Sequence, residues 1–518
     1  MGRTQGNGRP VKRGFLLATL VFAACTGPSA TTVVPSDTTV IPAASSLPSV
    51  TGTASEPAEP RPGGSGLGDS LYPQLGNGGY DVEHYALDLE FADGVLAGSA
   101  RLALRPTEPL SSFYLDFSGL DVSAVSVDDQ PADFETAEEL LIRPARPLTT
   151  GRVVSVRVDY EGTPGAVANF AGRFPVGWHK SVDGWFALSE PGGAERWFPS
   201  NNHPSDKATF SMRITVPDGL VAVSSGVLEG QESSGGRATF LWELDDPAAP
   251  YLVALAIGDF ERSEAESAGG VPIVNYFDSD LGAADRSLFD RQPEMMDLFA
   301  GIFGPYPFRE YGSLVLDTVQ VPAALETQTR STFGRQILVL GEAVVAHELG
   351  HQWFGDSVSI ADWGDIWLNE GFATYAQWLW TEHSRGPAAL SGEVAAAYNV
   401  MAGSSLVDAA GSEAAAYELA RATFPPPGSP SADDLFSQSV YVRGALTLHA
   451  LRLELGDDRF FEFLESWATD HRHGNVTTGD FLDLVGMEGG AGARRLMEAW
   501  LFSPDLPPID ELDLRPPS

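Results

Sequence analysis

The sequence predicts a multidomain α+β protein, in which a β-sandwich or saddle-shaped domain precedes a mainly helical domain. The chain has 518 residues and is 43% hydrophobic, enough for two to four domains with substantial cores. Residues 72 to about 260 alternate apolar with polar residues, which is typical of strands. From residue 290 onwards apolar residues recur at helical spacing instead.

The first domain, expected over residues 71–262, is predicted from short alternating runs. One run spans residues 85–91 and another spans residues 154–160. Turn sequences such as DDQPAD and TTGR separate these runs, and helical periodicity is nearly absent. Many strands without intervening helices favour a twisted β-sandwich or saddle.

The second domain is expected over residues 263–508. Residues 290–303 place Met295, Leu298 and Phe299 at helical spacing. The segment GPYPFREYGSLVLDTV predicts a loop that enters a buried strand, and QILVL at 336–340 predicts another strand. After residue 370 the pattern is helical to about residue 505, and residues 509–518 form a proline-rich tail.

Residues 1–25 are predicted to be a lipoprotein signal peptide. A basic start precedes Gly14 to Ala24, an apolar run of 11 residues that is too short to span a bilayer. The run ends in FAAC, where small residues precede Cys25 as in a bacterial lipobox, with Phe22 where leucine is usual. A lipid on Cys25 would anchor the protein at the extracellular face of the membrane. The alternatives are an ordinary cleaved signal with secretion, or a structural thiol.

Composition limits the partners and the means of stabilisation. Residues 26–70 are rich in Ser, Thr, Pro, Ala and Gly and predict a disordered tether. The net charge of -38 disfavours nucleic acid and anionic lipid surfaces as partners. The negative charge either favours cationic substrates or, more simply, reflects an exported proteome that is acidic in general. With Cys25 as the only cysteine, intrachain disulfides and cysteine-ligated metal sites are excluded.

The chemistry is concentrated in residues 344–370, VVAHELGHQWFGDSVSIADWGDIWLNE. His347 and His351 flank Glu348 in an HExxH pattern within a segment of helical character. A spacing of four places both imidazoles on one helix face, where they can hold one metal ion. Glu348 can act as a base toward a water molecule at that metal. The alternative is an amphipathic helix whose histidines and glutamate are solvated.

A third ligand is needed, because catalytic zinc usually takes three protein ligands and keeps one position open. The candidate is Glu370, separated from His351 by 18 residues and lying in the aromatic-rich segment WLNEGFATY, which predicts a second helix. The metzincin pattern is excluded, because Phe354 and Ser357 stand where it needs glycine and histidine. His347, His351 and Glu370 are therefore the predicted ligands of one Zn²⁺ per chain.

HELGHQWFG followed by WLNEGFATY resembles the gluzincin aminopeptidases of the aminopeptidase N and leukotriene hydrolase kind. The resemblance extends, with gaps, over most of residues 72–505. It implies a thermolysin-like catalytic domain and a peptidase that removes N-terminal residues from peptides, with Glu348 as general base. Many relatives carry a further helical domain that closes the active-site cavity. The resemblance here predicts a member without that domain and with an open cleft.

The resemblance also implies three further site residues. Glu190, in LSEPGGAERWFP, falls where the family binds the substrate's α-amine, and would otherwise be an ordinary turn glutamate. Glu326, in VPAALETQT, aligns with the glutamate of the family's Gly-Ala-Met-Glu-Asn motif, whose glycine, methionine and asparagine are not kept. Tyr441, in SQSVYVRGAL, falls on the family's oxyanion-stabilising tyrosine. By spacing alone Tyr441 would be a core residue on a helix face.

Together, Glu190 and Glu326 would form a negative end-stop for the substrate's amine, beside an edge strand that could pair with the peptide backbone. Asp356 and Asp365 are candidates to orient the histidines, or equally to cap surface turns. Two rival functions remain open. The altered motif is compatible with an endopeptidase or an unusual amidase, and the fold could also be kept as a catalytically inactive surface binding protein.

Overall fold

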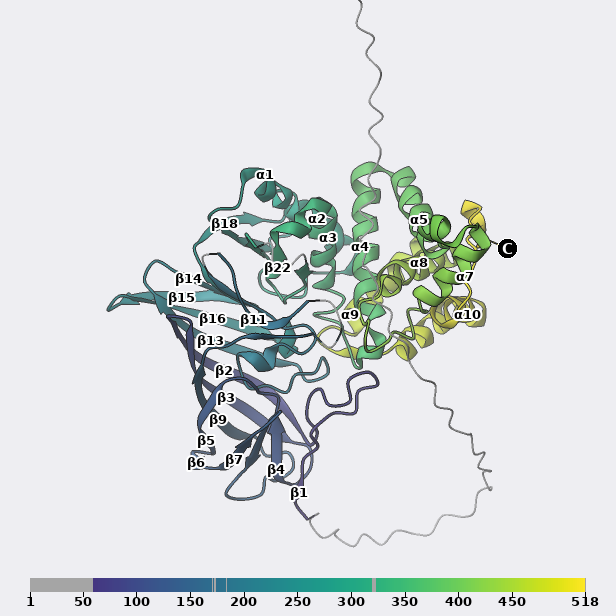
Figure 1. The fold of residues 1–518 in the computed structure, drawn as a ribbon. Coiled ribbons are helices and arrows are strands. Elements are labelled where there is room, and N and C mark those ends of the chain that lie inside the picture. The colour runs from purple at the N-terminus through teal and green to yellow at the C-terminus, as the bar shows by residue number, and fades with distance from the viewer. Residues whose placement is uncertain (1–58, 170, 172–173, 183, 319–322, 518) are drawn as a thin grey trace, which may run out of the picture. The chain divides into compact units, whose positions relative to one another are not determined.

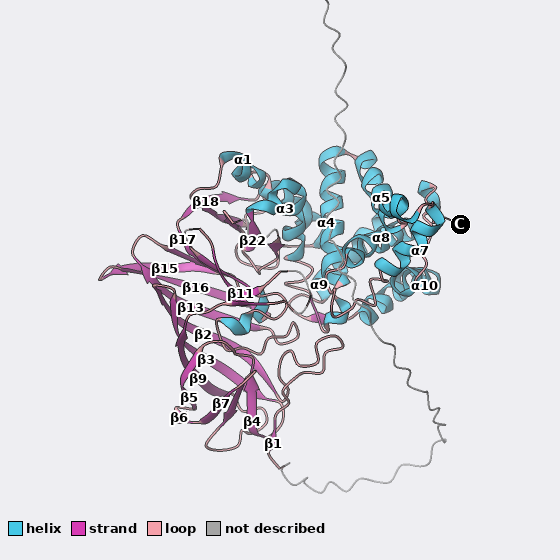
Figure 2. Ribbon diagram, viewed as in Figure 1, coloured by secondary structure: helices cyan, strands magenta, loops and turns pink. Residues whose placement is uncertain are grey.

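The computed structural model describes residues 59–169, 171, 174–182, 184–318 and 323–517 (Figure 1). Glu59–Ser518 form one compact unit. A region of strands is followed by a region of helices, which confirms the predicted α+β architecture (Figure 2). The predicted signal peptide, Cys25 and most of the predicted tether lie outside the described residues. No helix in the described ranges is long and apolar enough to cross a membrane.

An eight-stranded sheet forms the base of the N-terminal half. Its order is β15-β16-β13-β2-β3-β9-β5-β6, and β13 runs parallel to β2. Apolar and polar residues alternate along β9 as predicted, and the apolar ones are buried. The strands are β2 (Tyr80–Ala92), β3 (Val95–Pro106), β5 (Asp121–Val127), β6 (Gln130–Pro131), β9 (Val154–Gly162), β13 (Ala208–Pro217), β15 (Val227–Ser234) and β16 (Arg237–Ala248).

Two smaller sheets contribute to the same hydrophobic core. One has the order β1-β4-β8-β7 and the other the order β10-β11-β12-β17-β14. Their strands are β1 (Arg61–Pro62), β4 (Leu110–Leu115), β7 (Asp133–Thr136), β8 (Leu140–Arg143), β10 (Ala166–Val167), β11 (Val176–Lys180), β12 (Trp185–Leu188), β14 (Val221–Ser224) and β17 (Leu255–Gly258).

A further five-stranded sheet, in the order β18-β19-β20-β22-β21, belongs to both halves of the molecule. On β19, Val274 and Tyr276 belong to the core of the β region, whereas Ile273 and Phe277 belong to the core of the helical region. Alternate side chains of a strand point to opposite faces, so one sheet supplies both cores. Its strands are β18 (Phe260–Glu266), β19 (Pro272–Asp278), β20 (Ser313–Leu316), β21 (Ala324–Leu325) and β22 (Ser331–Gly334).

The helical region packs around α4 and α8, which contact each other closely. The helices are α1 (Ala283–Arg286), α2 (Gln292–Phe303), α3 (Glu342–His351), α4 (Trp367–Arg385), α5 (Pro387–Met401), α6 (Val407–Ala410), α7 (Glu413–Thr423), α8 (Gln438–Leu455), α9 (Asp457–Asp470) and α10 (Thr478–Phe502). A two-stranded sheet pairs β23 (Ser359–Ile360) with β24 (Asn475–Val476). Figure 1 shows α3 and α4 next to the sheet that contains β22.

The prediction of a strand at QILVL is wrong. Residues Arg335–Leu340 form a 3-10 helix, of which only Leu338 is buried and Val339 is 83% exposed. A short apolar run cannot be told from a helical turn by its pattern, and this run is not covered on both faces.

The predicted tether does not extend to residue 70. β1 pairs with β4, and the Asp69 carboxylate accepts hydrogen bonds from the backbone amides of Leu71, Tyr72 and Trp363. These bonds hold the segment through its backbone and one carboxylate. The composition of this segment, which is poor in apolar residues, therefore gave no sign of these hydrogen bonds.

Candidate active site

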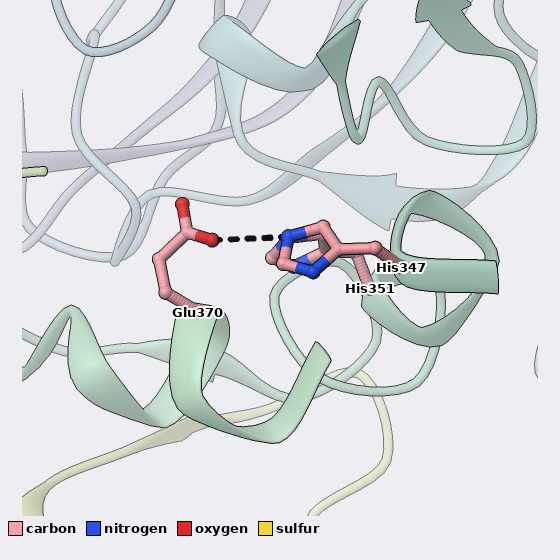
Figure 3. Close-up of side chains that lie close together, drawn as sticks. All are labelled: His347, His351 and Glu370. Carbon is pink, nitrogen blue, oxygen red and sulfur yellow. Dashed lines mark hydrogen bonds and ion pairs between the residues drawn. The ribbon is translucent and has the colours of Figure 1, made fainter. Parts of the chain in front are cut away.

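Two helices bring the three predicted metal ligands together. His347 and His351 lie one turn apart near the end of α3, and Glu370 lies in the first turn of α4. Figure 3 shows the carboxylate of Glu370 directed at the two imidazoles. The Nε2 atoms of the histidines are 3.1 Å apart, and Glu370 Oε2 lies 3.3 Å and 3.4 Å from them.

This triangle of donor atoms fits a zinc ion. Ligand atoms bonded to tetrahedral zinc at about 2.0–2.2 Å lie about 3.3–3.6 Å from one another. The observed separations of 3.1–3.4 Å are close to that spacing. His351 Nδ1 lies 3.1 Å from the Phe354 carbonyl oxygen, so it is the Nδ1–H that donates and Nε2 keeps its lone pair for a metal.

Glu370 and His351 stabilise each other's charge, whereas burial lowers the pKa of His347. Burial alone would raise the pKa of Glu370, but the two imidazoles outweigh burial and lower it. Burial alone would lower the pKa of His351, but the carboxylates of Glu326 and Glu370 raise it well above its usual value. The cluster therefore binds positive charge, either protons or a metal ion.

Neither aspartate predicted to orient the histidines does so. The carbonyl of Phe354 takes that role for His351. Asp365 instead accepts hydrogen bonds from the amide and hydroxyl of Thr478, at 3.1 Å and 2.6 Å, which fits the capping alternative. The side chain of Asp356 is fully buried, so it is no surface cap, and its oxygens lack hydrogen-bond partners among the described residues.

Glu348 lies beside the ligand triangle on the same helix. It is 4% exposed, and its Oε2 has no hydrogen-bond partner in the described part of the chain. Burial raises the pKa of Glu348 well above the usual value, and Glu326 adds to the effect. Ligand atoms of Glu348, Glu326 and His351 lie within 4.8 Å of one another. Its carboxylate is therefore placed to exchange a proton with a group at the metal.

Glu190 and Glu326 meet although they are 136 residues apart in the sequence. Glu190 follows β12 in the β region, and Glu326 follows β21, the last strand of the shared sheet. The two buried carboxyl groups are hydrogen-bonding neighbours. Burial raises the pKa of both groups, and the charge of Glu326 raises the pKa of Glu190 further. The structure thus brings together both residues that the resemblance implied.

Tyr441, on α8, also reaches this site. Its ring is stacked on that of His347 with the centroids 6.0 Å apart. Two residues later, the buried guanidinium of Arg443 donates to the backbone carbonyls of Trp500 and Ser503, at 2.8 Å and 2.6 Å. Arg443 therefore fastens the tyrosine-bearing turn of α8 to the end of α10.

Two sequence profiles match the chain. Residues 288–500 match the peptidase family M1 domain, and residues 81–252 match the peptidase M1 N-terminal domain. Together the matches cover more than half of the chain. The protein belongs to the M1 peptidase family.

Solved and curated relatives agree with this assignment. The M1 zinc metallopeptidase from Deinococcus radiodurans is 33% identical with a TM-score of 0.77, over 87% of this chain and 100% of that chain. Aminopeptidase M1-B from Oryza sativa is 27% identical over 81% of this chain and 49% of its own length. The probable M1 family aminopeptidase 1 of Encephalitozoon cuniculi is 25% identical over 83% of this chain and 52% of its own length. This M1 peptidase spans about half the length of these two curated relatives.

Three residues that support the M1 site were not found from the sequence. The side-chain amide of Gln352 accepts from the amide of Thr329 at 2.8 Å and donates to the carbonyl of Glu326 at 3.1 Å, so it fixes the loop that carries Glu326. A Cβ on Gly371 or Gly444 would lie 2.9 Å from the other glycine's Cα, so these glycines let α4 and α8 approach closely. Their positions inside NEGFA and YVRG were the available signal.

Lys207 ties the β region of the M1 peptidase to the metal-site helix. Its half-buried ammonium donates to the backbone carbonyls of Asp356 and Ser357, at 2.7 Å and 3.0 Å, just beyond α3. Burial lowers the pKa of Lys207 to about 7, although the charge of Asp356 opposes this. Lys207 begins the segment KATF, whose pattern gives no sign of this contact.

Proposed function

We propose that this M1 peptidase is a zinc aminopeptidase that removes N-terminal residues from peptides. One observation carries the proposal: the buried pair Glu190 and Glu326 lies next to Glu348 and the predicted zinc ligands. A carboxylate pair at that place can hold a free α-amine by charge-assisted hydrogen bonds. The aminopeptidase names of the curated relatives support the same activity.

The residues divide the reaction among themselves. His347, His351 and Glu370 would hold the zinc ion, which when bound supplies a Lewis acid for the scissile carbonyl and lowers the pKa of a water molecule. Glu348 accepts the proton of the attacking water and returns it to the leaving amine. Tyr441, beside His347, donates a hydrogen bond to the oxyanion. Glu190 and Glu326 fix the amine and so set which peptide bond is cleaved.

Replacing Glu326 by alanine tests the aminopeptidase proposal. The loss of a buried, charged hydrogen bond of about 1.5–3 kcal/mol should lower kcat/KM for free-amine substrates about ten- to a hundredfold. Aminoacyl-anilides and their N-acetylated counterparts are compared for the parent and for Glu326→Ala. The N-acetylated substrates should be cleaved poorly by both and should be nearly indifferent to the substitution.

Glu229→Ala provides a control, because Glu229 lies on β15 and pairs with Arg309 at the surface. If Glu326→Ala cleaves free-amine substrates as well as the parent, the carboxylate does not hold the amine. An endopeptidase or unusual amidase would then replace the aminopeptidase proposal. Loss of the family's asparagine favours that second candidate, since Thr327 in its place donates its hydroxyl within its own turn, to the carbonyl of Arg330.

We also propose that a lipid on Cys25 anchors the protein to the extracellular face of the membrane. The basic start, the apolar run and FAAC support this. Cys25→Ser should shift the protein from the membrane fraction to the soluble fraction, while specific activity in detergent extracts stays the same. Ser29→Ala, four residues later, is the matched control. Unchanged fractionation of Cys25→Ser would contradict the anchor.

A further inference from the structure

Three buried carboxyl groups beside the zinc ligands each keep one oxygen without a hydrogen-bond partner among the described residues. These oxygens are Glu190 Oε1, Glu326 Oε1 and Glu348 Oε2. The three residues are only 8%, 3% and 4% exposed. Buried carboxylates with unused oxygens are costly unless a partner compensates them. Something beyond the described hydrogen bonds is therefore needed to satisfy them.

The same carboxyl groups form a second set of metal donors. Ligand atoms of Glu326, Glu348 and His351 lie within 4.8 Å of one another. His351 Nε2 faces His347 and Glu370, so a second ion would depend chiefly on the carboxylates. Glu190, hydrogen-bonded to Glu326, adds a third carboxyl group. The hydroxyl of Tyr251, which is 1% exposed, also lacks a hydrogen-bond partner in the described part of the chain, and Glu326 is its strongest charged neighbour.

The charge of the pocket favours a second cation. With Glu190, Glu326, Glu348 and Glu370 all ionised, one zinc ion leaves two negative charges uncompensated. A divalent cation would relieve this repulsion, and it would engage the unused oxygens.

We infer that Glu326 and Glu348, assisted by Glu190, form a second and weaker site for a divalent cation, which overlaps the place proposed for the substrate's amine. Its donors are oxygens, which suit Mn²⁺ as well as excess Zn²⁺. An ion there occupies the general base and the amine-binding carboxylates at once. It therefore inhibits the enzyme in competition with free-amine substrates. The inhibition rests on the proposed function, whereas the binding does not.

Mn²⁺ is the probe, because it binds N/O ligands more weakly than Zn²⁺ and does not displace zinc from the histidine site. Zinc-loaded protein is titrated with Mn²⁺, and free Mn²⁺ is followed by its electron paramagnetic resonance signal. We expect one further Mn²⁺ per chain. Glu326→Gln and Glu190→Gln should each weaken Mn²⁺ binding at least about tenfold. The control Glu195→Gln changes a half-buried glutamate, which accepts a hydrogen bond from Ser118 in the β region, and should leave binding unchanged.

Leucinamide, which carries a free amine, should release Mn²⁺ from the parent protein, and N-acetyl-leucinamide should not. This measurement needs no variant and decides the overlap even if a substitution prevents folding. Absence of a second bound Mn²⁺, or equal binding by both Gln variants, would overturn the site. Release by neither amide would overturn the overlap with the amine. A failed aminopeptidase assay would leave the Mn²⁺ titration unaffected, so the two proposals fail separately.

Discussion

Glu348→Gln should lower kcat by about 10²–10⁴-fold while zinc stays bound at one ion per chain. The amide keeps the size and burial of the glutamate but cannot accept a proton. Because Glu348 is not among the three converging ligands, zinc affinity is expected to stay near that of the parent. The measurement is single-turnover hydrolysis of an aminoacyl-anilide, with metal content determined on the same samples.

Glu342→Gln is the matched control for this experiment. Glu342 lies in the first turn of the same helix and pairs with Arg291 at 3.0 Å, away from the metal ligands. It should leave kcat within about twofold of the parent, as surface ion pairs contribute little. A Glu348→Gln enzyme that holds zinc and turns over at the parental rate would rule out Glu348 as general base.

Glu370→Ala should abolish activity through loss of the metal. Two histidines remain, so zinc affinity should fall by more than the roughly ten- to hundredfold loss that is typical of removing a group outside the coordination sphere. Zinc stabilises only the folded state, by about 4.1 kcal/mol at a thousand times its dissociation constant. Added zinc should therefore raise the melting temperature of the parent much more than that of Glu370→Ala.

Glu462→Ala, an exposed glutamate on α9, controls for a general effect of losing a carboxylate. Its zinc-dependent rise in melting temperature should equal that of the parent. Stoichiometric zinc binding by Glu370→Ala, measured by equilibrium dialysis, would mean that another residue completes the site. The ligand assignment would then be abandoned.

The zinc ligands could be predicted from the sequence because their geometry is largely local. A spacing of four fixes His347 and His351 on one helix face, and Glu370 opens the neighbouring helix. The contact between Glu190 and Glu326, in contrast, is not local in the sequence. They meet only because β12 and β21, in separate sheets, place their following loops together, and no periodicity encodes such a contact. The resemblance to a family was needed to find them.

Other features were inaccessible for a similar reason. The bonds from Lys207 to the carbonyls beyond α3 join residues about 150 positions apart and involve backbone atoms, which every sequence has. Hydrogen bonds to backbone groups also hold the end of the segment that was predicted to be a tether. A backbone carbonyl, and not the predicted aspartate, orients His351. Sequence patterns predicted the apolar layers well, because burial of apolar side chains follows the periodicity of helices and strands. They predicted these hydrogen bonds to backbone atoms poorly.

The sheet from β18 to β22 has a consequence for how this protein holds together under stress. Since Val274 and Tyr276 face one core and Ile273 and Phe277 face the other, neither half can lose its structure without stripping one face of the same sheet. The two halves should therefore melt as one cooperative unit. A fragment that begins after the β region would present an uncovered apolar layer to solvent and aggregate.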